Sequence, residues 1–262
     1  MSVLTLVGVG WIVAAVVMAA LWAWNVRTTN AGIVDVGWTG LVGGLAVLDA
    51  FAAGGGMLGR RVAIAAMMGL WAARLTVFLL TDRVLGRPED GRYAELRRTH
   101  APRANAWFFW FFQAQAVAAV FFSTPALLST ANGSPRFAAA EVVAMALWAV
   151  AFAGEATADR QLLQFKKNPA NKGKTCQVGL WRYSRHPNYF FEWSIWIAYA
   201  LFASASPWGW TAWICPAALL YLLFKVTGIP ATEAQALRSR GDEYRRYQQT
   251  TSAFVPWFPR RA

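Results

Sequence analysis

The chain has 262 residues, of which 57% are hydrophobic and 15% are charged. This composition is too apolar for a soluble domain of that size. The formal net charge of +12 follows from the placement of Lys and Arg in a membrane protein, and it gives no support to nucleic-acid binding. The two cysteines and two histidines show no metal-ligand spacing, so no metal is expected.

Apolar stretches recur along the chain, each of about 20 residues, the length that a helix needs to cross a bilayer. The first stretch lacks the basic start and the small-residue cleavage site of a signal peptide, so we interpret it as a retained helix. We expect an all-α integral membrane protein, a bundle of seven transmembrane helices that forms a single membrane domain over residues 1–262. The predicted spans are residues 3–24, 34–54, 62–81, 106–129, 137–156, 188–206 and 208–228.

The basic residues predict an orientation. With the N-terminus outside, 21 of the 25 Lys and Arg residues lie in cytoplasmic segments and three lie in outer loops. Such a bias is typical of inner segments. We therefore expect a cytoplasmic C-terminus. No glycine-rich dinucleotide fingerprint is present, so any nucleotide would bind without a soluble nucleotide-binding fold.

The most informative motif is residues 179–192, which place polar side chains at the start of an apolar span. Pro187 suits the first position of a helix, so Asn188 and Glu192 fall one turn apart on one face. Arg182 and Arg185 precede the helix start, where backbone N–H groups also favour an anion. A glutamate in a membrane helix is a functional candidate by default. The motif predicts a cofactor-sized site.

Other polar groups gather at the same predicted end of the bundle. Glu155 and Asp159 lie four residues apart on one helix face, which fits either a ligand or water. The loop 166–174 is rich in Lys and Asn, and it is either a phosphate site or a marker of the inner side. Residues 231–250 predict one or two short amphipathic helices, followed by an aromatic end, residues 254–259, that re-enters the membrane interface. A surface helix that only touches lipid headgroups is the alternative.

Three sequence motifs occur in the second half of the chain: Asn168-Pro-Ala-Asn-Lys-Gly-Lys174, the motif at 179–192, and Glu243-Tyr-Arg-Arg-Tyr247. Together they resemble the steroid 5α-reductase superfamily, in particular its bacterial branch. The resemblance is clear over about residues 150–262 and weaker over 30–38 and 88–93. It implies a multi-pass protein of the bacterial inner membrane that binds NADPH from the cytoplasm. It also implies a substrate side in residues 1–130 and a cofactor side in residues 131–262.

The resemblance further implies the reduction of an enone lipid, most directly a 3-oxo-Δ4 steroid, that enters a monomer from the surrounding lipid. By matching positions, Asp159, Tyr183, Asn188 and Glu192 correspond to residues around the cofactor. Glu155 stands where steroid reductases commonly carry an asparagine, and Glu233 where they carry a histidine. The residues expected to bind the cofactor are Arg74, Glu155, Asp159, Lys166, Asn171, Lys172, Lys174, Arg182, Tyr183, Arg185, His186, Asn188, Glu192, Glu233, Arg238 and Tyr244.

The glutamine-glutamate pair of steroid reductases has no equivalent here. Asp35 is the candidate that replaces it, because an apolar environment favours a protonated carboxylic acid that donates a hydrogen bond to a developing oxyanion. Tyr93 is the second catalytic candidate, and Trp38 and Gln113 are expected to contact the substrate. The alternative for Asp35 is an ion pair with Arg74 that fastens two helices together.

Two other functions fit parts of the sequence. Membrane methyltransferases of the isoprenylcysteine carboxyl type share the pattern Arg-His-Pro-x-Tyr-x-x-Glu, but their S-adenosylmethionine carries no phosphate. The lysine-rich loop with Arg182 and Arg185 favours a phosphate-bearing cofactor. A non-catalytic transporter or lipid binder would commonly show inverted repeats and polar groups near the bilayer midplane, and neither is visible here.

Overall fold

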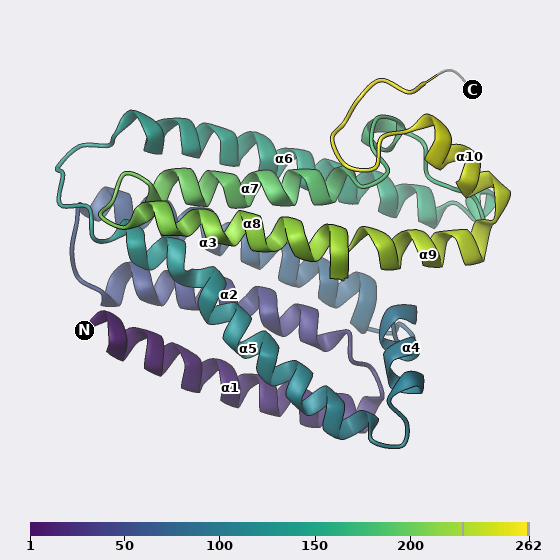
Figure 1. Cartoon of the computed structure of the whole chain (residues 1–262), viewed down its shortest axis with the longest axis horizontal. Coiled ribbons are helices and arrows are strands. Elements are labelled where there is room, and N and C mark those ends of the chain that lie inside the picture. Colours follow the sequence, from purple (N-terminus) through teal and green to yellow (C-terminus); the bar gives the residue numbers. More distant parts are fainter. Residues whose placement is uncertain (227, 261–262) are drawn as a thin grey trace. The chain divides into compact units, whose positions relative to one another are not determined.

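The computed structural model describes residues 1–226 and 228–260, which form two compact units (Figure 1). Unit 1 comprises Met1–Val142 and Tyr199–Ala212, and unit 2 comprises Val143–Ala198 and Trp213–Ala262. Every regular element in the described residues is a helix or helical turn, apart from one isolated bridge between Ser184 and Ser252. The predicted all-α class is confirmed.

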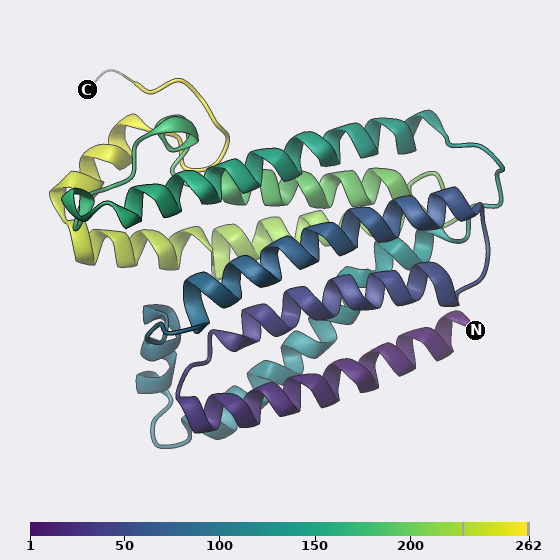
Figure 2. The ribbon, with the colours of Figure 1, turned by 180° about the vertical axis from the view of Figure 1, so that it is seen from behind.

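Unit 1 is built around α2, which packs against α1, α3 and α5 (Figures 1 and 2). Its core contains large side chains that are fully buried, among them Met68, Trp71, Phe108 and Phe112. The short α4 follows a π-helical turn and contacts α5. The elements are α1 (Val3–Thr28), α2 (Ile33–Ala52), α3 (Leu58–Leu79), the π turn Leu80–Val84, α4 (Gly91–Thr99) and α5 (Ala104–Ser129).

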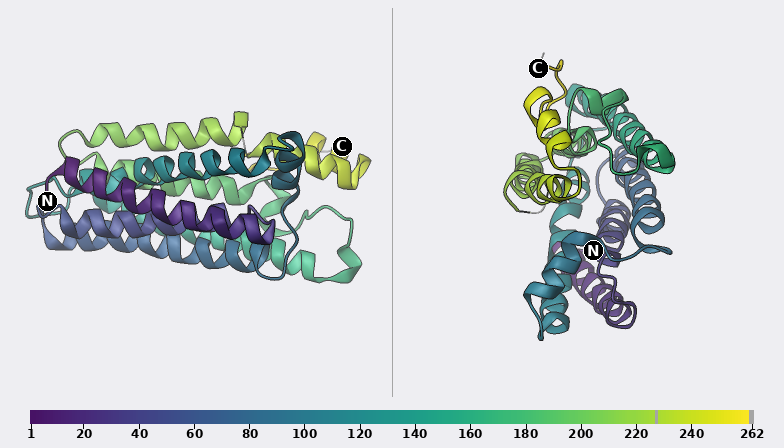
Figure 3. Two further views of the ribbon diagram at one scale, coloured as in Figure 1. Left: turned by 90° about the horizontal axis from the view of Figure 1, so that it is seen from below. Right: turned by 90° about the vertical axis from the view of Figure 1, so that its right-hand side faces the viewer.

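Unit 2 holds most of α6 and α7 and all of the C-terminal helices. The short helices predicted for residues 231–250 are confirmed as α9 and α10, which follow one another around a turn at Gly241 (Figure 3). The elements are α6 (Ala139–Lys167), α7 (Pro187–Ala203), α8 (Ile214–Tyr221), α9 (Ile229–Arg240) and α10 (Asp242–Thr250), with 3-10 turns at Pro169–Asn171, Gly179–Arg182 and Gly209–Trp213 and a π turn at Leu222–Val226.

Six helical stretches in the described residues are long and apolar enough to cross a membrane. Large apolar side chains such as Leu4, Trp110 and Val150 are exposed along them, as expected where lipid replaces water. The chain is therefore an integral, multi-pass membrane protein. Helix α7 has 17 residues, fewer than the about 20 that a span requires, so the seventh span stays a prediction. The six stretches are Val3–Thr28, Ile33–Ala52, Leu58–Val84, Ala104–Ser129, Ala139–Lys167 and Gly209–Arg240.

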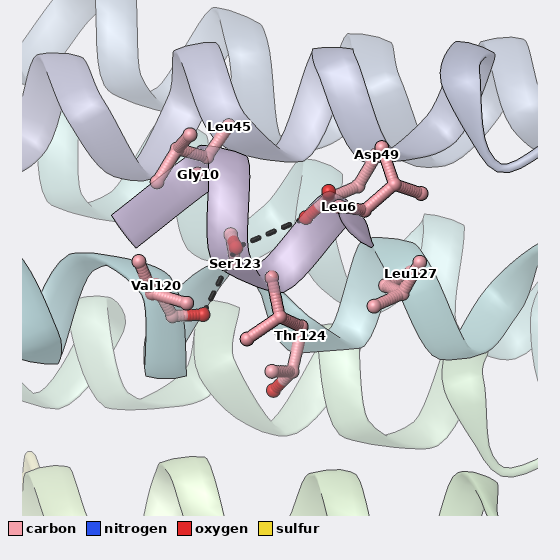
Figure 4. A pocket seen from close by; sticks show the side chains of 9 residues that line it. Leu6, Gly10, Leu45, Asp49, Val120, Ser123, Thr124 and Leu127 are labelled. Atoms are coloured by element: carbon pink, nitrogen blue, oxygen red, sulfur yellow. Dashed lines mark hydrogen bonds between the residues drawn. The ribbon is translucent and has the colours of Figure 1, made fainter. Parts of the chain in front are cut away.

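A small cavity in unit 1 contains a buried carboxyl group that the sequence analysis did not single out (Figure 4). Asp49 of α2 is 6% exposed and accepts a hydrogen bond of 3.1 Å from the Ser123 hydroxyl of α5. Leu6 and Gly10 of α1 and Leu127 of α5 supply apolar walls. The cavity volume of about 10 Å³ leaves room for roughly one water molecule. This hydrogen bond ties α2 to α5 at the end of α2.

Candidate functional site

In unit 2, the motif that precedes α7 is fastened to α6 through a tight turn. Gly179 has a φ of 58°, a conformation that glycine adopts without strain, and a Cβ atom there would collide with Gln161. Gln161 accepts a hydrogen bond of 2.8 Å from the Leu180 amide, and the Trp181 indole donates to the Ala158 carbonyl at 2.9 Å. The sequence did not predict this contact of Gln161, because a polar residue on a helix gives no signal of its partner.

Predicted cofactor residues from α6 and α7 meet in the interior of unit 2. Asp159 and Glu155 are buried, and the Asn188 side-chain amide donates to Asp159 Oδ1 at 3.4 Å. In this hydrogen bond the amide nitrogen of Asn188 faces Asp159. Asn188 Oδ1 is then a buried acceptor with no hydrogen-bond partner among the described residues. Glu192, one turn along α7, accepts from the Trp196 indole at 2.8 Å. An unsatisfied buried acceptor costs about 1–3 kcal/mol, so Asn188 is suited to a ligand that donates.

Glu233 of α9 is the acceptor at the centre of a second cluster. Arg185 Nε donates to it at 2.6 Å, Gln248 Nε2 at 2.8 Å and the Tyr244 hydroxyl at 3.5 Å, and His186 Nε2 lies 3.3 Å away. Burial, and then the charge of Glu233, raise the pKa of Tyr244, so its hydroxyl stays protonated and donates. Glu233 therefore holds α9 and α10 against the residues that precede α7. Sequence reasoning missed Gln248.

Glu233→Gln is expected to destabilise the protein by about 3 kcal/mol, because Arg185 would keep its charge in a mostly buried position without a counterion. Thermal unfolding of the purified protein in detergent measures the change. Asp242→Asn is the matched control, since its partner Arg245 is 70% exposed and exposed pairs contribute about 0–1 kcal/mol. Equal losses in the two variants would contradict the role of Glu233.

The other predicted residues of unit 2 lie nearer its surface. Asn171 donates to the Phe165 carbonyl at 3.0 Å, which closes the loop after α6, and Arg238 donates to Gln235 at 2.9 Å rather than to Glu233. Tyr183 is half-buried, and its carbonyl accepts from the Trp257 amide at 2.9 Å. The predicted phosphate-binding cations are exposed: Lys166, Lys172, Lys174 and Arg182.

In unit 1, the structure brings the two catalytic candidates into direct contact. The Tyr93 hydroxyl donates to Asp35 Oδ1 at 2.6 Å. Arg83 donates to Asp35 Oδ2 at 3.1 Å, and Arg92 lies 3.8 Å from the same oxygen. The π turn after α3 supplies Arg83, and α4, whose N-cap is Asp90, supplies Tyr93 and Arg92.

These contacts alter the interpretation of Asp35. Both oxygens of Asp35 accept hydrogen bonds, one from Tyr93 and one from Arg83, whereas the sequence analysis expects a carboxyl group that donates. Its ion-pair partner is Arg83 and not Arg74, which lies in α3. Burial, and then the charge of Asp35, raise the pKa of Tyr93 well above its ordinary value of 10.0. Tyr93 is therefore the group that keeps a proton to donate.

A neighbouring network fixes the loops that carry this cluster. Glu89 accepts from the Ala31 amide at 2.8 Å and from two nitrogens of Arg97 at 2.7 and 3.0 Å. Arg97 also donates to Asn25 Oδ1 at 2.8 Å, at the end of α1. The sequence signal for this network is the weak resemblance at 30–38 and 88–93, which contain Ala31 and Glu89.

The two predicted substrate residues also lie in unit 1. The Trp38 ring meets Trp71 and Phe122 edge to face, at centroid distances of 6.2 and 5.5 Å, and its indole N–H has no hydrogen-bond partner among the described residues. Gln113 of α5 donates to the Ala15 carbonyl of α1 at 3.3 Å, a contact between helices. Within the described residues, no group of three or more His, Cys, Asp or Glu side chains could hold a metal ion.

The fold and these polar clusters define a helical membrane protein with buried ionisable groups. Residues 21–251 match the family described as "Protein of unknown function (DUF1295)", which is a steroid 5α-reductase-like family, and the chain belongs to it. It is similar to an uncharacterised protein of Schizosaccharomyces pombe, with 27% identity over 277 residues, which cover 95% of this chain and 79% of the relative. A comparison with solved structures gave no match.

Proposed function

We propose that this protein is a membrane reductase that uses NADPH to reduce the carbon-carbon double bond of an enone lipid, with 3-oxo-Δ4 steroids as the substrate class. The observation that carries the proposal is Asn188 Oδ1, a buried acceptor without a partner among the described residues, beside the buried Asp159. It occurs in a chain of a steroid 5α-reductase-like family.

The side chains of unit 2 suit the groups of this cofactor. Asn188 Oδ1 would accept from the carboxamide N–H of the nicotinamide, and Asp159 and Glu155 offer acceptors for ribose hydroxyls. The exposed Lys172, Lys174 and Arg182 supply cations for phosphates. The proposal includes seven spans with the N-terminus outside, because NADPH is a cytoplasmic molecule and the basic segments are expected on the inner side.

In unit 1, the proposed chemistry assigns separate roles to Tyr93 and Asp35. NADPH, when bound, supplies the hydride that adds to the carbon β to the substrate carbonyl, and a proton completes the neighbouring carbon. When the substrate binds, the Tyr93 hydroxyl would give up its hydrogen bond to Asp35 and donate its single proton to the carbonyl oxygen instead, as negative charge develops there. Asp35 is a positioning residue that holds the Tyr93 hydroxyl until the substrate arrives, and Arg83 holds the Asp35 carboxyl group.

The test is thermal unfolding of the purified protein in detergent with NADPH or S-adenosylmethionine. A ligand at 100 times its Kd stabilises the folded state by about 2.7 kcal/mol, so NADPH alone is expected to raise the Tm. The shift should be lost in Asn188→Ala and kept in the control Gln249→Ala, which changes an exposed residue of α10. A shift with S-adenosylmethionine alone would indicate a methyltransferase. Unchanged NADPH binding by Asn188→Ala would refute the site, and progesterone and testosterone are the first enones to assay.

A further inference from the structure

After α10 the chain turns back along the loop that precedes α7 (Figure 1). We call residues 252–260 the C-terminal strap. The Arg185 amide donates to the Ser252 carbonyl at 2.8 Å, the Ser184 hydroxyl to the Phe254 carbonyl at 2.7 Å, and the Trp257 amide to the Tyr183 carbonyl at 2.9 Å. The strap therefore pairs with three consecutive residues, of which Tyr183 and Arg185 belong to the candidate cofactor site.

One aromatic side chain anchors the strap inside unit 2. Phe254 is 7% exposed and packs with the buried Leu223 and Ile229. Its ring lies 5.7 Å from the Phe190 ring and 5.7 Å from the Trp193 ring, both of α7. This contact positions the first half of the strap through apolar burial.

The second half presents apolar side chains to the outside. Val255, Trp257 and Phe258 are 52%, 70% and 76% exposed. Three large apolar side chains within four residues are unfavourable in water and mark a contact surface. Tryptophan in particular is enriched where a membrane meets water.

The charges beside these aromatic residues select the partner. Arg182 and Arg260 are exposed, and the strap contains no Asp or Glu. Each Lys or Arg near an anionic membrane surface contributes about 1 kcal/mol of attraction. Aromatic side chains combined with cations match the headgroup region of an anionic bilayer.

We propose that the strap is an interfacial membrane anchor, that its partner is an anionic lipid surface, and that this contact holds residues 183–185 of the candidate cofactor site in place. Lipid contact fixes Trp257 and Phe258, so that the Trp257 amide keeps its hydrogen bond to Tyr183 and the Ser252 carbonyl, in the same strap, keeps its hydrogen bond from the Arg185 amide. The coupling holds whether or not the site binds NADPH.

A depth measurement tests the membrane contact. A fluorophore is attached to Phe258→Cys in a background of Cys176→Ala and Cys215→Ala, and the protein is placed in nanodiscs with lipids that carry nitroxide quenchers. Headgroup-level quenchers should quench residue 258 at least about threefold more than residue 242 labelled through Asp242→Cys, and anionic lipid should increase the difference. Equal quenching at the two positions would overturn the proposal. Concentration-dependent crosslinking through residue 258 would also overturn it, because the partner would then be a second copy.

Hydrogen exchange tests the coupling to the site. In anionic nanodiscs, the hydrogen of the Arg185 amide should exchange about tenfold faster in the double variant Trp257→Ser with Phe258→Ser than in the unchanged protein. The reason is that this amide is hydrogen-bonded to the strap, at the Ser252 carbonyl. The control is Trp208→Ser with Trp210→Ser, which removes two exposed indoles of unit 1. An unchanged rate at Arg185 in the strap variant would show that lipid contact does not hold the site.

Discussion

Tyr93→Phe is expected to lower enone reduction by about 10²–10³-fold, the usual loss when one donor to a developing oxyanion is removed. The substitution removes only the hydroxyl that donates to Asp35 at 2.6 Å, and the ring keeps its buried position. The loss should appear in kcat, because the hydrogen bond strengthens as charge develops on the substrate oxygen. The measurement is NADPH oxidation with a saturating enone in detergent or nanodiscs.

The matched control is Tyr221→Phe, which changes a tyrosine of α8 that is 63% exposed and should leave the rate unchanged. NADPH binding, followed by thermal shift, should be normal in both variants. Normal binding with an unchanged rate in Tyr93→Phe would move the donor to another residue. Loss of binding in Tyr93→Phe would mean that the change disturbed the fold and not the chemistry.

Asp35→Asn tests the positioning role through the same assay. An amide can still accept from Tyr93, but it no longer balances Arg83 and Arg92, so the orientation of the hydroxyl should be lost in part. Because Asp35 acts through Tyr93, the double variant should be no slower than Tyr93→Phe alone. Additive losses would show that Asp35 has an independent role.

The pH profile separates Tyr93 from stronger acids, which lose their proton at lower pH. Burial, and then the charge of Asp35, raise the pKa of Tyr93 well above 10.0. The Tyr93 hydroxyl therefore remains protonated throughout the neutral and mildly alkaline range. The rate should therefore show no alkaline decline due to Tyr93 below its ordinary pKa. A decline in that range that disappears in Tyr93→Phe would contradict the assignment.

The apolar pattern was sufficient to predict the class and most of the spans, because burial in lipid depends on local composition. It was less informative where a helix is interrupted. The pattern predicts one span over residues 208–228. The described residues of this stretch form three successive elements, a 3-10 turn, α8 and a π turn, and Gly228 precedes the next helix, α9. Helix α6 continues to Lys167, beyond the end of the span predicted for residues 137–156.

The partners of the site residues were harder to predict, because they are distant in sequence. Asp35 and Tyr93 are 58 residues apart, and Arg185 and Glu233 are 48 apart. Each was selected singly, from its apolar surroundings or from the resemblance. The replacement of Arg74 by Arg83 as the partner of Asp35 depends on the π turn, and hydrophobic periodicity carries no signal for that turn.

The buried ion pair of Arg60 and Glu141 is the largest such omission, since Arg60 entered the sequence analysis only as an outer-loop charge. Both side chains are 0% exposed. Arg60 also donates to the carbonyls of Asn132 and Ser134, each at 3.0 Å, and Glu141 accepts from the Ala138 amide at 2.7 Å. The pair thus fastens the start of α3 to the start of α6 within unit 1, and the two carbonyl contacts of Arg60 add the loop between α5 and α6.

Glu141→Gln is expected to destabilise the protein by about 3–5 kcal/mol, because it leaves the Arg60 charge buried without a counterion. Thermal or chemical unfolding in detergent measures the loss. Glu95→Gln is the control, since Glu95 pairs with Arg98 at 2.7 Å in an exposed position, where about 0–1 kcal/mol is expected. The double variant Arg60→Met with Glu141→Met should lose less than the sum of the single changes, because no unpaired charge remains. If Glu141→Gln lowered the stability as little as Glu95→Gln, water or lipid headgroups would have to reach Arg60. The ion pair would then lie at a solvated surface and would contribute little to the stability of unit 1.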